Sequence, residues 1–396
     1  MSNTTKMSSF EIRTSLFLAS VYGLRMLGMF LILPIFSIYA SQLSGSPSQL
    51  QIGLALGVYG LTQAIFQIPF GISSDIIGRK KVIYFGLTIF ILGSLIAGVS
   101  TQIEGIIIGR AIQGAGAISA VLTALLADLT REEHRTKAMA IIGASIGFTF
   151  ALSLVISPWL NEAIGVPGIF FMMAVLSLMA FLLVRFCIPE PTRESNKTSI
   201  TLKDFYSILG RIDLGRLNLG IFVLHATQIS MFMAVPFFLI SQGDIPLQDH
   251  WKVYLPVLLG SFILIIPVII FSERLKQVKK AFLMSILTLL TAQFSFIYFS
   301  NDLTGIIISL LIYFVGFNFL EASLPSLVSK IAPANKKGLA LGVYNTSQSL
   351  GIFVGGSAGG LITKFYGNSG TFLFCGVLIF IWFVLSLSMN IPTKKS

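Results

Sequence analysis

Four ionisable side chains lie inside long apolar stretches of the sequence: Arg25, Arg110, His225 and Glu321. A charge held away from water is costly, so such residues pair with one another, line a polar pathway or carry protons. Glu321 is the one acid among them. Burial raises the pKa of a carboxyl group and a nearby cation lowers it, and this competition can bring titration near neutral pH. We therefore expect Glu321 to carry a proton, with His225 as relay or partner and Arg25 in the same layer. The alternative is a static ion pair of Glu321 with Arg25 that only fixes packing.

The stretches that hold these residues belong to an unusually apolar chain. Of its 396 residues, 55% are hydrophobic and 11% are charged, whereas a soluble domain carries roughly 25% charged residues. The mean hydropathy is +0.87. Such a chain has too little polar surface to coat a water-facing globule, which excludes a soluble enzyme or a DNA-binding protein.

A helix needs about 20 apolar residues to cross the hydrocarbon core of a bilayer, and twelve segments reach that length. They are 14–41, 49–71, 82–100, 104–129, 137–163, 166–188, 216–242, 250–272, 280–299, 303–328, 338–363 and 369–390. They are too long to be strands of an outer-membrane barrel, which alternate over about ten residues. The sequence therefore predicts an all-α membrane protein with twelve transmembrane helices.

One long connection divides the chain between the sixth and seventh segments. The predicted parts are an N-terminal six-helix half over 1–188, a cytoplasmic linker over 189–215 and a C-terminal six-helix half over 216–396. Apolar residues at helical spacing within 202–209 favour a short amphipathic helix on the membrane surface, and a solvated linker is the alternative. Charged loops recur at matching places in the two halves. Two such repeats around a central cavity are a common transporter plan, so transport is the default hypothesis.

The positive charges are distributed unevenly between the loops. The termini, the linker and the loops that follow even-numbered segments hold 23 of the 27 Lys and Arg residues. Such loops stay in the cytoplasm, so both termini are expected to be cytoplasmic. The net charge of +11 is then a signal of topology, and no nucleic-acid partner is expected.

The motifs in the sequence indicate which energy source can drive transport. The sequence contains no Walker A pattern, so ATP is not expected to drive transport. Nothing resembles a nucleophile with its base or a set of metal ligands, so neither an enzyme, a cofactor nor a metal site is expected. A proton gradient is left as the energy source, because one charge moved across roughly 100 mV is worth about 2.3 kcal/mol.

A few polar residues share helix faces with aromatic and Met side chains. The expected lining of a substrate cavity is Tyr22, Met26, Gln63, Gln67, Gln228, Phe232 and Asn318. A mostly apolar cavity with few polar points suits a small amphipathic compound better than a sugar. The alternative is that most of the aromatic residues face lipid. The expected partners are small-molecule substrates, protons and the lipid bilayer, and we expect a monomer.

Two motifs make a known family recognisable. The loop GISSDIIGRKKVI resembles the signature loop of the major facilitator superfamily, and its matching residues are Gly71, Asp75, Gly78, Arg79 and Lys80. The stretch IIIGRAIQGAGAIS resembles a second motif of this family around a buried arginine, and its matching residues are Arg110, Gln113, Gly114 and Gly116. The resemblance covers residues 14–390 and implies the major facilitator fold, in which two six-helix pseudo-repeats rock about a central cavity.

Within the superfamily, the sequence looks like the drug:proton antiporter branch of the bacterial cytoplasmic (inner) membrane. In this family the loop acid latches the outward-open state. The resemblance thus implies that Asp75 faces the N-terminus of the eleventh segment near Gly338, where the helix dipole attracts negative charge, and that Arg79 pairs with Asp128. The alternative is that the basic loop only sets topology.

The antiporter motif of this branch is incomplete in the fifth segment. Gly143 and Gly147 fit the motif, but Phe148 stands at the position of its proline. The prediction is a multi-pass, proton-coupled secondary transporter that exports small amphipathic or drug-like compounds by alternating access. A proton-coupled importer of a small nutrient and a transporter-like ligand sensor remain as alternatives. Some similar transporters carry a further cytosolic domain; the printed sequence ends at Ser396, so none is expected here.

Overall fold

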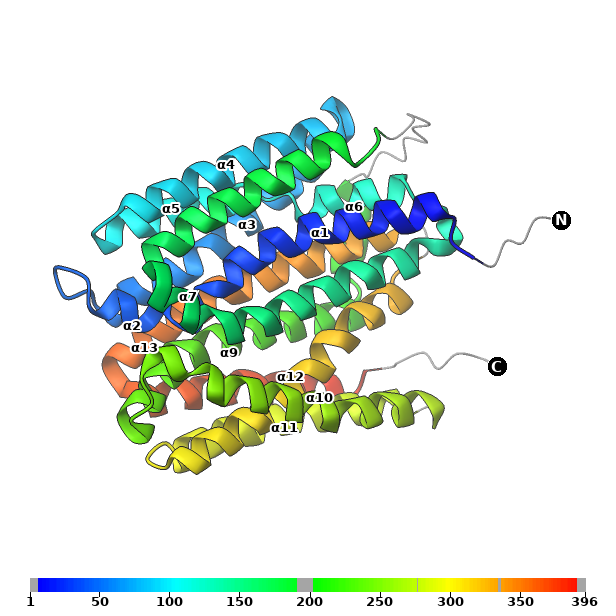
Figure 1. The fold of residues 1–396 in the computed structure, drawn as a ribbon. Helices are drawn as coiled ribbons and strands as arrows, with labels where there is room; N and C mark the ends of the chain where they lie inside the picture. The colour runs from blue at the N-terminus through cyan, green and yellow to red at the C-terminus, as the bar shows by residue number, and fades with distance from the viewer. Residues whose placement is uncertain (1–5, 191–201, 276, 334–335, 390–396) are drawn as a thin grey trace.

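A computed structural model describes residues 6–190, 202–275, 277–333 and 336–389 of the chain. These residues form an elongated bundle of helices without a strand (Figure 1). Helix α1 begins and helix α13 ends at the same end of the bundle, which we call the terminal end. At the opposite end, the turn end, α7 and α13 reverse direction.

The first half of the chain forms seven helices: α1 (Ser9–Leu31), α2 (Phe36–Ser41), α3 (Gln49–Ile77), α4 (Arg79–Val99), α5 (Ile103–Ala115), α6 (Ser119–Asp128) and α7 (Arg135–Phe186). After the short helix α8 (Leu202–Leu209), the second half forms α9 (Ile212–Gly243), α10 (Trp251–Arg274), α11 (Val278–Tyr298), α12 (Leu303–Ile331) and α13 (Lys337–Leu387). Helix α8 lies where the sequence predicts an amphipathic helix, whereas residues 191–201 of the linker lie outside the described residues.

Two of these helices cross the bilayer twice. Helix α7 is 52 residues long and α13 is 51, and each contains a glycine in the left-handed region. Gly165 has φ 67° and Gly367 has φ 68°, a backbone conformation that side chains disfavour. Each helix is thus a pair of arms joined by a reversal. Ten helical segments of the described residues are long and apolar enough to span a membrane, and the two reversals give twelve crossings, which confirms the predicted fold class.

The structure corrects two of the predicted segments, which are interrupted rather than continuous. The segment 14–41 stops at Leu31 and resumes as α2 after a turn that contains Pro34, whose ring removes a helix donor and clashes with the preceding turn. The segment 104–129 breaks between α5 and α6 at the sequence GAGAI. A Cβ on Gly116 would overlap the carbonyl oxygen of Gly86 in α4, so the chain can pass there only without a side chain.

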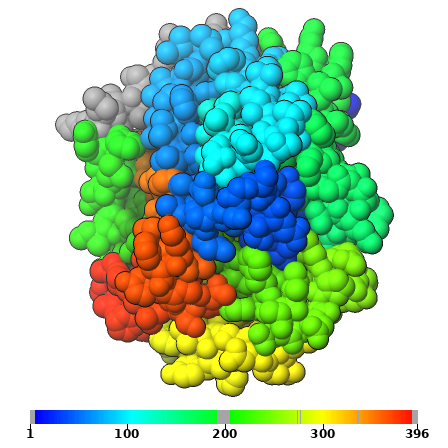
Figure 2. Space-filling model, turned by 90° about the vertical axis from the view of Figure 1, so that its left-hand side faces the viewer, coloured from blue at the N-terminus to red at the C-terminus, as the bar shows by residue number. Residues whose placement is uncertain are grey.

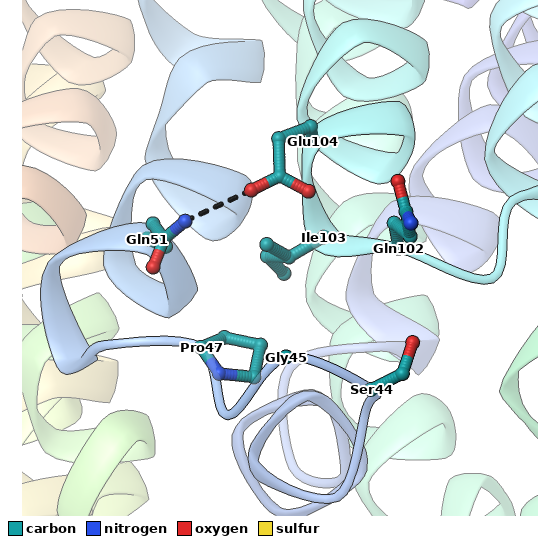
Figure 3. A pocket seen from close by; sticks show the side chains of 7 residues that line it. All are labelled: Ser44, Gly45, Pro47, Gln51, Gln102, Ile103 and Glu104. Carbon is teal, nitrogen blue, oxygen red and sulfur yellow. Dashed lines mark hydrogen bonds between the residues drawn. The ribbon is translucent and has the colours of Figure 1, made fainter.

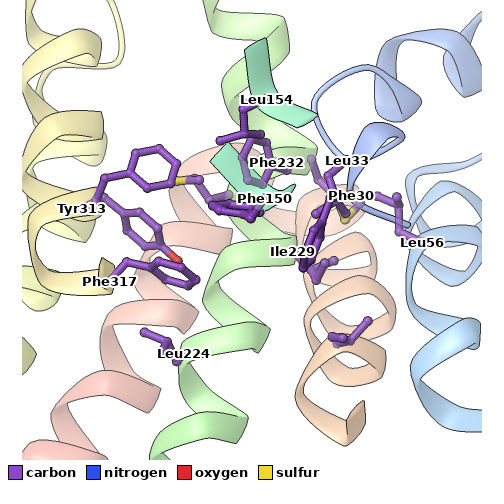
Figure 4. Packing of buried hydrophobic residues seen from close by; sticks show 14 of the residues in the cluster. Phe30, Leu33, Leu56, Phe150, Leu154, Leu224, Ile229, Phe232, Tyr313 and Phe317 are labelled. Carbon is purple, nitrogen blue, oxygen red and sulfur yellow. The ribbon is translucent and has the colours of Figure 1, made fainter. Parts of the chain in front are cut away.

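The two halves lie side by side along the length of the bundle (Figure 1). The first arm of α13, from Lys337 to Gly367, packs against α9 of its own half and α3 of the other half. A core of aromatic and aliphatic side chains joins the halves at mid-depth and draws on α1, α3 and α7 as well as α9 and α12 (Figure 4). Phe232, one of the predicted site residues, is part of this core.

Candidate functional site

The backbones of the two halves touch along α3 and the first arm of α13, toward the turn end. A Cβ on Gly53 would overlap the carbonyl oxygen of Gly356, and a Cβ on Gly57 would lie 2.8 Å from the carbonyl oxygen of Phe353. A Cβ on Gly360 would likewise overlap the carbonyl oxygen of Gln49. No side chain can be inserted at these points, so the turn end is closed by direct backbone contact.

Among the described residues, the same face of α13 has no close neighbour at the terminal end. Gly338 and Gly342 lie on the face that carries Gly356 and Gly360, because they are separated by helical repeats. A Cβ on Gly338 or on Gly342 would have no neighbour within 4 Å. The contact between α3 and α13 therefore ends before the terminal end is reached. The halves are in contact at one end and parted along this face at the other.

Helix α2 completes the closure of the turn end. Its segment lies between the two halves in Figure 2, which views the molecule from that end. Ile35, Phe36 and Ala40 are fully buried, and the Ser37 hydroxyl donates a hydrogen bond of 3.2 Å to the Phe232 carbonyl of α9 in the opposite half. The interruption of the first span thus supplies a segment that covers the interface.

An aromatic cluster seals the interface at mid-depth. Phe150 of α7 lies 5.1 Å from Phe30 of α1 between ring centroids, and 6.3 Å and 5.9 Å from Phe314 and Phe317 of α12. Figure 4 shows Phe150 between Phe30 and the pair Tyr313 and Phe317. Because Phe30 and Phe150 belong to the first half and the other rings to the second, separation of the halves at this level must divide the cluster.

Glu321 lies on α12, one helical turn from Phe317. Its carboxylate atom Oε2 is buried and has no hydrogen-bond partner, and no ion pair of the described residues includes it. The neighbouring Asn318 donates a hydrogen bond of 2.9 Å to the Ser261 hydroxyl of α10 and so does not serve the carboxylate. The site thus holds an unpaired acid beside an aromatic cluster.

His225 does not contact Glu321, contrary to the simplest relay expected from the sequence. Its Nδ1 lies 3.3 Å from the Ile221 carbonyl oxygen, and its Nε2 lies 2.7 Å from the amide nitrogen of Gln348. Both ring nitrogens are therefore occupied. Phe317 lies 6.2 Å away between ring centroids. Gln348 was missed by the sequence analysis, although it is a polar residue within an apolar span.

Arg25 does not pair with Glu321, so the alternative of an ion pair between these two residues is not found among the described residues. Its guanidinium donates to the Ser119 hydroxyl at 2.8 Å, the Tyr59 hydroxyl at 2.9 Å and the Gly116 carbonyl at 3.1 Å. The break between α5 and α6 leaves that carbonyl outside a helix, so it can accept from the arginine. Arg25 therefore belongs to the interior of the first half.

Arg110 ties α5 to α3 within the same half. It donates to the Ala55 carbonyl at 3.2 Å and to Gln113 Oε1 at 2.9 Å, and its guanidinium carbon lies 4.9 Å from the Tyr59 ring centroid. Gly114 is in contact with Tyr59 of α3 and leaves no space for a Cβ. Tyr59 thus joins Arg25 through its hydroxyl and Arg110 through its ring. No carboxylate of the described residues pairs with either arginine.

The signature loop lies at the terminal end between α3 and α4. Arg79 Nε lies 2.8 Å from Asp128 Oδ2, the pair expected from the resemblance, and Arg79 Nη1 lies 2.5 Å from Asp75 Oδ1. The Lys80 Nζ atom donates a hydrogen bond of 2.7 Å to the Ile188 carbonyl oxygen. Asp75 does not reach the start of α13, where Gly338 has open space. The implied latch contact is therefore not made in this conformation.

Two glycines of the signature loop shape its backbone. Gly78 has φ 107°, which a residue with a side chain rarely adopts, and it separates α3 from α4. A Cβ on Gly71 would lie 4.0 Å from the Ala120 Cβ of α6, an ordinary van der Waals contact. The sharp turn at Gly78 directs the next residue, Arg79, toward Asp128.

The predicted cavity lining is mostly closed in this conformation. Tyr22, Gln63, Gln67, Gln228 and Phe232 are buried, whereas Met26 and Asn318 retain partial exposure. The Tyr22 hydroxyl donates to the Ser119 carbonyl at 2.9 Å, and neither amide atom of Gln67 has a partner. These residues lie in the packed interior between helices, and their role in lining a substrate cavity stays a prediction.

A measurable hollow of about 400 Å³ lies elsewhere, on the surface of the turn end. It lies between the α2–α3 and α4–α5 connections, and Gln51 donates a hydrogen bond of 3.0 Å to Glu104 across it (Figure 3). Its lining residues are Ser44, Gly45, Pro47, Gln51, Gln102, Ile103 and Glu104. None of the four buried ionisable residues lines it, so it is separate from the interior site.

Comparison with known proteins places the chain in a class defined by this fold. The Major Facilitator Superfamily description matches residues 18–356 and 251–396, and the chain belongs to that family of membrane transporters, which are not enzymes. The inner membrane transport protein YajR of Escherichia coli K12 is 43% identical over 396 residues, covering 100% of this chain and 87% of YajR. The chain is thus similar to a bacterial inner-membrane protein over its whole length.

More distant similarities agree with this assignment. Multidrug resistance protein 2 of Bacillus subtilis is 27% identical, covering 93% of each chain. A solved bacterial homolog of the human lysosomal transporter Spinster, in an inward-facing and occupied conformation, superposes with a TM-score of 0.76 at 12% identity, covering 99% of this chain and 100% of that one. That likeness shows the fold alone.

Proposed function

We propose that the chain is a proton-coupled secondary transporter that exports small amphipathic or drug-like compounds by alternating access. The observation that carries the proposal is the unpaired carboxyl group of Glu321 in the interior of α12. An ionised carboxylate without a partner is costly in apolar surroundings, so a proton on Glu321 is favoured while the site is closed as described. Entry of water or of a cationic compound would reverse that preference and release the proton.

The distribution of cations supports Glu321 over the buried arginines as the group that changes state. Arg25 and Arg110 are held by carbonyl, hydroxyl and ring partners within the first half. A guanidinium group remains charged in proteins, so neither arginine can release a proton in a transport cycle. Glu321 lies one helical turn along α12 from Phe317, a ring of the aromatic cluster that joins the halves.

Export of amphipathic compounds is supported by the chemistry around Glu321 and by one relative. The aromatic cluster supplies apolar surface and ring faces next to a single acid, which suits a lipophilic compound with a polar or cationic group. Multidrug resistance protein 2 matches the chain over most of its length. Moving one charge across roughly 100 mV is worth about 2.3 kcal/mol, which sustains a gradient of roughly 50-fold.

The charge distribution supports the orientation. Arg79, Lys80 and Lys81 and the other basic loops lie at the terminal end, and basic loops remain cytoplasmic. We place both termini in the cytoplasm and the protein in the bacterial inner membrane. The described conformation, closed at the turn end, is then closed toward the outside of the cell.

The test uses everted membrane vesicles with an acidified interior and a pH-sensitive dye. Lipophilic cations and neutral drugs are added to vesicles that contain the wild type, Glu321→Gln or Glu162→Gln, the last a matched control at an exposed acid of the α7 reversal. We expect proton efflux upon addition of a compound in the wild type and the control, and none in Glu321→Gln.

Other outcomes would overturn parts of the proposal. An equal response in Glu321→Gln would remove Glu321 as the proton carrier. Further acidification of the interior upon addition of the compound would indicate symport and import. Binding of a compound without any proton movement or translocation would indicate a ligand sensor.

A further inference from the structure

The contacts of His225 fit one protonation state in the orientation that the structure gives them. The Ile221 carbonyl oxygen can only accept a hydrogen bond, so the Nδ1 atom 3.3 Å away must carry a hydrogen. With the Gln348 amide oriented as in the structure, its nitrogen donates to the Nε2 atom 2.7 Å away, which then carries no hydrogen. The arrangement is that of a neutral imidazole protonated at Nδ1.

The backbones of α9 and α13 hold this pair in place. A Cβ on Gly351 would overlap the Phe222 carbonyl oxygen, and a Cβ on Gly355 would overlap that of Ala226. These two contacts bracket His225 along α9. The backbones of α9 and α13 therefore lie in direct contact next to the residues that carry the imidazole and the Gln348 amide.

A glutamine at this position can serve both charge states of the histidine. Rotation of the amide by a half turn replaces its NH₂ group with Oε1, which can accept from an Nε2–H group. The Nδ1–H contact with Ile221 is the same in both states. A carboxylate would serve only the charged imidazolium, and an apolar side chain would serve neither state.

We propose that Gln348 is a positioning residue that accommodates both charge states of His225 and links them to the first arm of α13. That arm also carries Gly356, which touches α3 in the other half. A change at His225 therefore acts on the helix that closes the turn end. Whether the contact between His225 and α13 contributes to transport rests on the proposed proton coupling.

Other titratable groups near this level do not compete for the imidazole. They are Tyr313 and Glu321 on α12, Tyr344 on α13 and Tyr59 on α3. Tyr313 shares a hydrogen bond of 3.3 Å with Thr227, and Tyr59 accepts from Arg25. Neither ring nitrogen of His225 contacts any of the four.

The test follows the histidine directly by ¹⁵N nuclear magnetic resonance of histidine-labelled protein in lipid nanodiscs. The chain has three histidines, and the His225 signals are assigned by their loss in His225→Asn. Spectra are recorded across a pH series for the wild type, Gln348→Glu and Gln348→Leu. Ser347→Ala is the matched control, because its hydroxyl donates only within α13, to Val343.

We expect opposite shifts in the two variants. An adjacent carboxylate favours the imidazolium by about one pH unit or more, so its signal should persist to higher pH in Gln348→Glu. In Gln348→Leu the Nε2–H group has no acceptor, so the imidazolium signal should retreat to lower pH or vanish. Ser347→Ala should follow the wild type, and Gln348→Asn, a shorter amide, should fall between wild type and Gln348→Leu.

Two results would overturn the inference: no displacement of the His225 signals in Gln348→Glu, or displacement in the same direction in Gln348→Glu and Gln348→Leu. Monodisperse elution of each variant shows that it is folded. The measurement needs no transported compound, so a silent vesicle assay would refute the proposed function and leave this result standing.

Discussion

The contact between Gly53 and Gly356 predicts a conformational switch that a single methyl group can bias. A Cβ on Gly356 would overlap the Gly53 carbonyl oxygen and lie 2.9 Å from the nitrogen and 3.0 Å from the Cα atom of Gly57. All three neighbours are backbone atoms of α3, which cannot rotate away as a side chain can. The clash in Gly356→Ala can therefore be relieved only by moving α3 and α13 apart.

The size of the effect follows from the cost of overpacking. An extra methylene forced into a close-packed interior costs about 1–3 kcal/mol. The whole of this cost falls on the conformation that is closed at the turn end, because the contact is lost when the halves separate there. We expect the population ratio of the open to the closed turn end to rise by about 5- to 150-fold.

Gly342→Ala is the matched control for this variant. Gly342 lies on the same helix and the same face, and a Cβ there would meet nothing within 4 Å. Both variants gain the same helix propensity, about 1 kcal/mol per Gly-to-Ala change. The difference between them isolates the contact with α3.

Pulsed electron spin resonance distances can measure the two populations. Val99 and Tyr366 are exposed at the turn end, one in each half, and labels at these positions report its opening. The free cysteines Cys187 and Cys375 are first replaced. A longer distance component should grow in Gly356→Ala and remain at the wild-type level in the control. An unchanged distribution in folded Gly356→Ala, or equal growth in the control, would refute the reasoning.

Three further results follow from single contacts. Tyr59→Phe removes the acceptor for Arg25, and since a hydrogen bond to a charged group is worth about 1.5–3 kcal/mol, chemical unfolding in detergent should show a loss of that size; an unchanged stability would contradict the described contact. Arg110→Lys lacks the planar fork that reaches the carbonyls of α3, so we expect a loss of about 1–3 kcal/mol by the same measurement. Asp128→Asn removes a partly exposed ion pair with Arg79, worth about 0–1 kcal/mol, so a stability loss well above that range would show that the pair does more than join α4 to α6.

The sequence predicts the membrane-spanning segments well because the physical requirement is simple and local. A span needs length and apolar composition, and both can be read along the chain. The breaks within spans follow a different rule. The GAGAI stretch separates α5 from α6 because Gly116 lies against Gly86 of α4, a contact between distant residues that hydropathy does not contain.

The site was harder to predict because depth along a span does not fix direction around it. The sequence analysis placed Arg25 in the same layer as Glu321, but its side chain donates hydrogen bonds to Tyr59 and Ser119 within its own half. The Arg79 and Asp128 pair was easier to predict, since the family resemblance implies it and both residues lie at helix ends at the same end of the bundle. Gln348 has no neighbouring motif to identify it.

The buried charges divide the molecule into a fixed half and a half that can change state. Arg25 and Arg110 both contact Tyr59 in the first half. Both guanidinium groups are permanently charged and have neutral partners, so neither arginine needs to gain or lose a proton. Glu321 and His225 lie in the other half, where one is unpaired and the other is held by an amide that can face either way. The first arm of α13 contacts His225 through Gln348 and also contacts the backbone of α3, so a change in the charge of His225 and a change in the contact between the halves act on one helix.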